Sequence, residues 1–163
     1  MPSYERLAAL EPWKVEIEWT RPALYENARE YADNADAWLY MILGSFGSSE
    51  RRIFYIGKTV NQYVKDRLSQ PDHLRRYARL KRDHPRHRLL VSLGILRVKN
   101  GNITNARVDQ IETMLIYTAG CREPHIMNKK KIWVLRTEEP YFIKNSGYRR
   151  PLPKEIHHGI FVR

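Results

Sequence analysis

The chain has 163 residues, of which 42% are hydrophobic, so residues 1–163 are expected to form a single domain with a buried core. Lys and Arg outnumber Asp and Glu by 29 to 18, and the net charge of +11 favours a polyanionic partner such as nucleic acid over simple solubility charge. No apolar run approaches the roughly 18 residues of a membrane span. The start resembles no secretory signal, and the single Cys121 excludes an internal disulfide or a multi-cysteine zinc site, so we expect a cytoplasmic protein.

The first 36 residues are predicted to be an N-terminal addition to the domain. Apolar and charged residues alternate over residues 14–19, which is the pattern of a half-buried strand. Pro22 can open a helix, and apolar residues then recur at helical spacing as far as Tyr31. These elements predict a strand and a helix ahead of the core.

A hairpin is predicted at the start of the core. The apolar runs 38–43 and 52–57 have the length of strands and flank the Gly- and Ser-containing segment 44–49. Two such runs joined by a turn indicate an antiparallel pair. Residues 61–68 and 73–82 follow as two predicted helices.

A third strand and a longer helix complete the predicted core. Residues 88–98 are rich in Leu, Val and Ile, and the Asn100-Gly101 pair indicates a turn. Thr104 can cap a helix that Gly120 would end, with an apolar stripe of Val108, Ile111, Leu115 and Ala119.

The order of elements predicts an α+β fold: a three-stranded antiparallel sheet flanked by helices, spanning residues 37–131. Residues 132–163 contain Pro140, Pro151 and Pro153 and are predicted to be an extended C-terminal arm that wraps this core.

Five motif elements occur in order along the core. They are Trp38-Leu39-Tyr40, Tyr55-Ile56-Gly57-Lys58, Arg67, Glu112 and Asn128. In this order the chain resembles the GIY-YIG nuclease family, whose hairpin carries two such tyrosine motifs, followed by an arginine, a glutamate and an asparagine.

Two departures from the family pattern are visible. Trp38-Leu39 stands where Gly-Ile is usual, and Arg67 follows Tyr55 by 67 − 55 = 12 residues, about two more than is typical. Arg51 and Arg52 are therefore alternative candidates for the arginine.

The resemblance implies hydrolysis of DNA phosphodiester bonds with Mg²⁺ or Mn²⁺, in the manner of a small restriction-like endonuclease. Glu112 offers a hard oxygen for one Mg²⁺, and Arg67 offers a planar fork for the phosphate. Tyr40 could accept a proton from water if its pKa fell well below about 10, which a cation such as Lys58 would favour. Tyr55 is the second choice for this role.

His73 and Asn128 complete the candidate catalytic set. The resemblance implies that the histidine holds a tyrosine hydroxyl or relays a proton, and that the asparagine organises the site. Purely structural roles are the alternatives: a packed core tyrosine, an exposed histidine at a helix start, an asparagine that caps a turn.

A dense run of basic residues is predicted to bind the DNA backbone. Leu74, Tyr77 and Leu80 are expected to form the buried side of helix 73–82, which leaves guanidinium groups on its outer face. The candidate nucleic-acid-binding residues are Arg75, Arg76, Arg79, Arg82, Lys129, Lys130 and Lys131.

Three functions remain open from the sequence. The first is a metal-dependent DNA endonuclease, acting on duplex DNA and drawing specificity from its own insertions or from a homodimer. The second is a non-catalytic nucleic-acid-binding module on the same fold, and the third is an RNA-processing or toxin-like nuclease.

Overall fold

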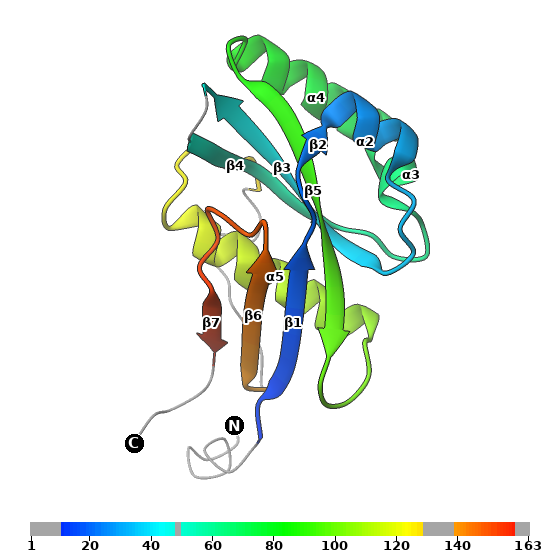
Figure 1. The fold of residues 1–163 in the computed structure, drawn as a ribbon, viewed down its shortest axis with the longest axis vertical. Helices are drawn as coiled ribbons and strands as arrows, with labels where there is room; N and C mark the ends of the chain where they lie inside the picture. Colours follow the sequence, from blue (N-terminus) through cyan, green and yellow to red (C-terminus); the bar gives the residue numbers. More distant parts are fainter. Residues whose placement is uncertain (1–10, 48–49, 129–138, 159–163) are drawn as a thin grey trace.

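The structure, a computed structural model, describes residues 11–47, 50–128 and 139–158 (Figure 1). Its elements in chain order are β1 (Trp13–Trp19), β2 (Ala23–Leu24), α2 (Tyr25–Tyr31), β3 (Ala37–Phe46), β4 (Glu50–Lys58), α3 (Val64–Leu68), α4 (Pro71–Asp83), β5 (Arg88–Val98), α5 (Asn105–Gly120), β6 (Tyr141–Gly147) and β7 (Glu155–His158).

The strands form one mixed, strongly curled sheet, so the predicted three-stranded antiparallel sheet is wrong. The strand order is β4-β3-β5-β1-β6-β7, and the short β2 pairs alongside β5. The predicted strands are present as β3, β4 and β5 and are antiparallel. The sheet extends further because β5 is 11 residues long and pairs on both of its edges, with β3 over residues 88–95 and with β1 over residues 94–98. The pairing with β1 protects an edge of β5 that would otherwise be exposed.

The C-terminal segment is part of the sheet and not an extended arm. β6 runs parallel to β1, and β7 returns antiparallel to β6. Two side chains fix this pairing, because Trp19 Nε1 donates to Asn145 Oδ1 at 2.9 Å and Asn145 Nδ2 donates to the Pro153 carbonyl at 2.9 Å. Gly147 ends β6 with φ +64, where a Cβ would overlap the Trp19 carbonyl oxygen.

The sheet has a hydrophobic core on each face, because successive side chains of a strand point to opposite sides. On one face, Leu39 and Met41 of β3 pack with α5. On the other, Tyr40 and Ile42 pack with α2, α3 and α4. Figure 1 shows α2, α3 and α4 gathered at one end of the molecule, whereas α5 crosses the strands β6 and β1.

The helices α4 and α5 agree with their predictions to different degrees. α5 begins as predicted, with Thr104 Oγ1 accepting from the Arg107 backbone N–H at 3.2 Å, and it ends at Gly120. The predicted buried side of α4 is wrong in part: Leu80 is buried, but Leu74 is 38% exposed and His73 is buried instead. None of the helices in the described ranges is both long and apolar enough to cross a membrane.

Candidate functional site

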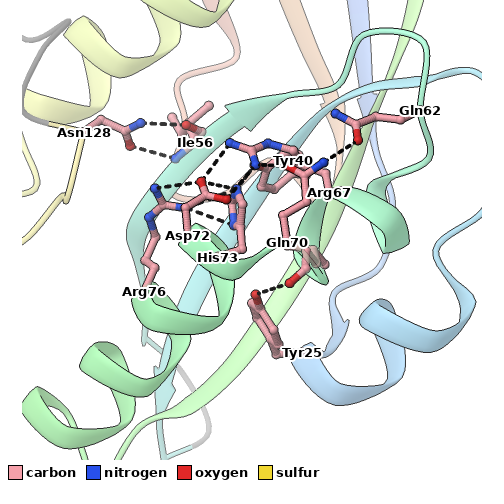
Figure 2. A network of polar contacts seen from close by, with 11 residues as sticks. Tyr25, Tyr40, Ile56, Gln62, Arg67, Gln70, Asp72, His73, Arg76 and Asn128 are labelled. Carbon is pink, nitrogen blue, oxygen red and sulfur yellow. Dashed lines mark hydrogen bonds and ion pairs between the residues drawn. The ribbon is translucent and has the colours of Figure 1, made fainter.

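A pocket of about 590 Å³ lies at the edge of the sheet formed by β4. The segment that follows α5 runs along this edge: Met127 N donates to the Phe54 carbonyl at 2.8 Å. Asn128 makes two further bonds, accepting from Ile56 N at 2.8 Å and donating to Ile56 O at 2.7 Å (Figure 2). Because β4 is an edge strand, groups from α4 on one face and α5 on the other meet in this pocket.

The pocket brings together three of the predicted catalytic residues with two of the predicted nucleic-acid-binding arginines. Tyr55, Glu112 and Asn128 line it, together with Arg76, Arg79, Ile116 and residues 124–127. Glu112 is only 7% exposed, since it lies on α5 next to the buried Ile111. Both the oxygen and the nitrogen of the Asn128 side-chain amide hydrogen-bond the backbone of β4. This is compatible with the expected role of Asn128, which is to organise the site.

Tyr40 lies next to Tyr55, with the two ring centres 6.1 Å apart, and explains the glycine of the second motif. Tyr40 on β3 is paired with Gly57 on β4, and a Cβ at position 57 would overlap the Tyr40 ring and hydroxyl. The tyrosine is fully buried, and its hydroxyl oxygen lies 2.9 Å from His73 Nε2. Gly57 therefore makes room for a buried Tyr40–His73 pair.

The electrostatics of this pair oppose the expectation that Tyr40 ionises easily. Burial raises the pKa of Tyr40 well above its ordinary value of 10.0, and the charges of Arg67 and Arg76 counter this only in part. Lys58 was expected to lower that pKa, but its ammonium lies 2.6 Å from an Asp109 carboxylate oxygen. In this state Tyr40 is a neutral phenol.

His73 is also neutral at ordinary pH. Burial first, and then the positive charges of Arg76 and Arg67, lower the pKa of His73 from 6.5 to about 3. A neutral imidazole can accept a hydrogen bond at one ring nitrogen and donate one at the other. His73 can therefore bridge the Tyr40 hydroxyl to a guanidinium, because a guanidinium only donates.

Arg76 is the guanidinium that joins this pair to the pocket, although its basic neighbours had predicted only a role in DNA binding. Arg76 Nη1 donates to His73 Nδ1 at 2.9 Å, and its guanidinium carbon lies 3.9 Å from the centre of the Tyr55 ring. A signal for this role was present, because residues three apart on a helix share a face, and Arg76 follows His73 by three.

Arg67 does not line the pocket, and its guanidinium donates hydrogen bonds to a carboxylate and to a side-chain amide. It donates two bonds of 3.0 Å to the carboxylate of Asp72 and a third to Gln70 (Figure 2). These hydrogen bonds hold the pKa of Asp72 below its ordinary value. Asp72 Oδ2 also lies 4.0 Å from Arg76 Nη2, so the first turn of α4 ties the two arginines together.

Glu112 is the acidic side chain that lines the pocket. Within residues 11–47, 50–128 and 139–158 no cluster of three His, Cys, Asp or Glu is placed to bind a metal. A buried carboxylate beside an open pocket nevertheless fits Mg²⁺, which takes few protein ligands and keeps several waters. The donor set does not fit zinc, which needs three or four protein ligands.

Basic side chains of α4 lie in the pocket wall and on the exposed face of the same helix. Arg79 lines it, while Arg75 and Arg82 are exposed on the same helix, where Arg79 and Arg82 also pair with Asp83 at 3.3 and 3.0 Å. The predicted basic residues 129–131 lie outside the described residues. The predicted nucleic-acid-binding residues that the structure describes therefore all lie on α4.

Comparison with protein-family models, curated proteins and solved structures gave no match. The function is therefore inferred from the chemistry of the pocket itself.

Proposed function

We propose that the chain is a metal-dependent endonuclease that hydrolyses DNA phosphodiester bonds in the pocket around Glu112, in the manner of the GIY-YIG nucleases that its motifs resemble. One observation carries the proposal: a carboxylate only 7% exposed opens onto the same pocket as Arg76, Arg79 and Tyr55. Phosphodiester hydrolysis needs this combination of a metal ligand, cations for the phosphate and a group that can position water.

Glu112 would hold Mg²⁺ or Mn²⁺, and the ion would polarise the phosphate and lower the pKa of a bound water. Arg76 and Arg79 would contact the phosphate oxygens as the negative charge on the phosphate grows. The Tyr55 hydroxyl, on the pocket wall, would hydrogen-bond the attacking water or the scissile phosphate.

Tyr40 receives a different role from the one that the motif resemblance implies. Its buried position and raised pKa favour a positioning role, in which the Tyr40–His73 pair holds Arg76 in place over Tyr55. Arg67 supports the same geometry from outside the pocket through Asp72, which reaches both arginines.

The basic face of α4 supports a nucleic-acid substrate. Arg75, Arg79 and Arg82 lie on the helix that forms one wall of the pocket, so a backbone that follows the helix would deliver a phosphate to Glu112. Duplex DNA is our proposed substrate, and RNA is the alternative that a substrate panel would reveal.

A second function has specific support. The neutral, buried Tyr40 and the bidentate pairing of Arg67 with Asp72 leave two of the family's expected catalytic groups engaged in structural contacts. A non-catalytic nucleic-acid-binding module would show the same arrangement.

Cleavage of supercoiled plasmid with Mg²⁺ separates the two functions. We expect nicked and linear products from the wild type and none from Glu112→Gln, while Glu123→Gln cleaves like the wild type, because Glu123 is half-buried but lies outside the pocket lining. DNA binding without cleavage by any of the three proteins would favour the binding module.

A further inference from the structure

A second pocket, of about 360 Å³, lies where β3 begins and β4 ends. Its volume falls within the range of small-molecule sites, about 300–1,000 Å³. Two bonds from Thr59 fix its floor, because Thr59 N donates to the Trp38 carbonyl at 2.9 Å and Thr59 Oγ1 donates to the Ala37 carbonyl at 2.9 Å. The backbone on either side of this pocket is therefore held in place without a ligand.

The walls combine aromatic faces with amide groups. Trp38 is half-buried and packs against the core, whereas Tyr63 is 42% exposed, and Asn61 and Gln62 supply side-chain amides. Lys65 is outside the lining, but its ammonium lies 5.6 Å from the centre of the Tyr63 ring and 4.0 Å from an Asp33 carboxylate oxygen. Asn61 adopts φ +54, a left-handed conformation that asparagine tolerates better than most residues with a side chain.

This chemistry suits a flat heteroaromatic ring with polar edges. Nucleobases stack on aromatic side chains whatever their sequence, and amide side chains can donate and accept along a base edge. A purely aliphatic ligand would make no hydrogen bond with the Asn61 amide or with the Gln62 amide nitrogen.

A hydrogen-bonded relay connects this pocket to the candidate active site. Gln62 Oε1 accepts from Gln70 Nε2 at 2.9 Å, and Gln70 in turn accepts from Arg67 (Figure 2). Arg67 binds Asp72, which also lies beside Arg76. The two pockets therefore share one polar network, and one nucleic-acid strand could occupy both.

We propose that the pocket between Trp38 and Tyr63 binds a nucleobase, stacked on the aromatic rings with its polar edge against Asn61 and Gln62. The proposal rests on the proposed function, since it takes the base to belong to the strand bound at Glu112. A free mononucleotide offers the same chemistry and is the other source of such a base.

The test measures binding without metal, so that cleavage plays no part. Quenching of tryptophan fluorescence is followed as adenosine, guanosine, cytidine or thymidine 5′-monophosphate is added in EDTA, with ribose 5-phosphate as the control that lacks a base. A single-stranded oligonucleotide with 2-aminopurine, whose own fluorescence falls on stacking, reports whether the base can come from a strand.

Tyr63→Ala is the diagnostic variant, and Tyr63→Phe keeps the ring. Tyr31→Ala is the matched control, because Tyr31 is 73% exposed on α2 and does not line the pocket. Circular dichroism checks that each variant is folded, which we expect for exposed side chains.

We expect saturable binding of the mononucleotides, weakened on the order of 5- to 150-fold by Tyr63→Ala, which is the range of base–aromatic stacking. Tyr63→Phe and Tyr31→Ala should stay within about twofold of the wild type. If only the 2-aminopurine oligonucleotide binds, the ligand is a base within a strand. If the mononucleotides bind as well, the pocket also accepts free nucleotides.

Equal affinity for ribose 5-phosphate and the mononucleotides would overturn the proposal, as would unchanged binding of both probes by Tyr63→Ala. Failure of the nuclease proposal would look different. In that case the wild type would not cleave plasmid, yet base binding would still depend on Tyr63.

Discussion

His73 makes the stability of the fold depend on pH. The folded protein holds His73 neutral, with a pKa lowered from 6.5 to about 3, whereas the unfolded chain takes up a proton below about pH 6.5. Between these two values the unfolded state binds more protons, so stability falls as pH falls. The contribution of His73 is fully present above pH 6.5 and is lost progressively toward pH 3.

The size of the effect follows from the two pKa values. Between pH 7 and pH 5, His73 lowers the folding equilibrium constant by about 1.4 log units, so the free energy of unfolding falls by about 2 kcal/mol. His84 and His158 also have lowered pKa values and add to the same trend. His73→Gln removes only the contribution of His73, because the amide does not titrate.

Urea unfolding of the wild type and His73→Gln at about pH 5, 6 and 7 measures this difference. We expect the wild type to lose about 2 kcal/mol more than the variant between pH 7 and pH 5. Parallel losses in the two proteins would refute the conclusion that His73 is held neutral, and with it the hydrogen-bonded link between Tyr40 and Arg76.

Three further predictions concern the site and its DNA. Gly57→Ala should displace the buried Tyr40 ring, lower stability by about 1–3 kcal/mol in thermal unfolding and reduce cleavage; unchanged melting would contradict the packing account. Asn128→Ala removes two bonds to the Ile56 backbone and should cost about 1–3 kcal/mol, with cleavage falling more than DNA binding; equal losses of both would argue against an organising role. DNA affinity should fall about 10³- to 10⁵-fold between 50 and 200 mM salt if six to ten phosphates are contacted, with a shallower slope for Arg79→Ala; a flat response would exclude backbone binding.

Local patterns in the sequence were sufficient to predict most elements, but not how they assemble. β5 was predicted at its observed bounds, 88–98, and α5 was predicted from its cap at Thr104 to its end at Gly120. β6 was missed because it pairs with β1 across more than a hundred residues, and because nearby prolines favoured an extended arm. A parallel pairing of this kind leaves no turn signal in the sequence.

The candidate site shows the same division between local and tertiary information. Motif order identified Tyr55, Glu112 and Asn128, which the fold brings to one pocket. The burial of Tyr40 depends on α4 packing over β3, which no local pattern encodes, so the direction of its pKa shift could not be predicted. Arg76 was placed on the outer face because its neighbours are basic, although its spacing from His73 placed it on the inner one.

Titration of Mg²⁺ into supercoiled plasmid with wild type and Glu112→Gln side by side tests the central claim most directly. The account predicts nicked and linear DNA that appear with added metal in the wild type alone, while both proteins bind DNA equally well in EDTA. Cleavage that survives in Glu112→Gln, or a wild type that binds DNA but never cuts it at any metal concentration, would contradict it.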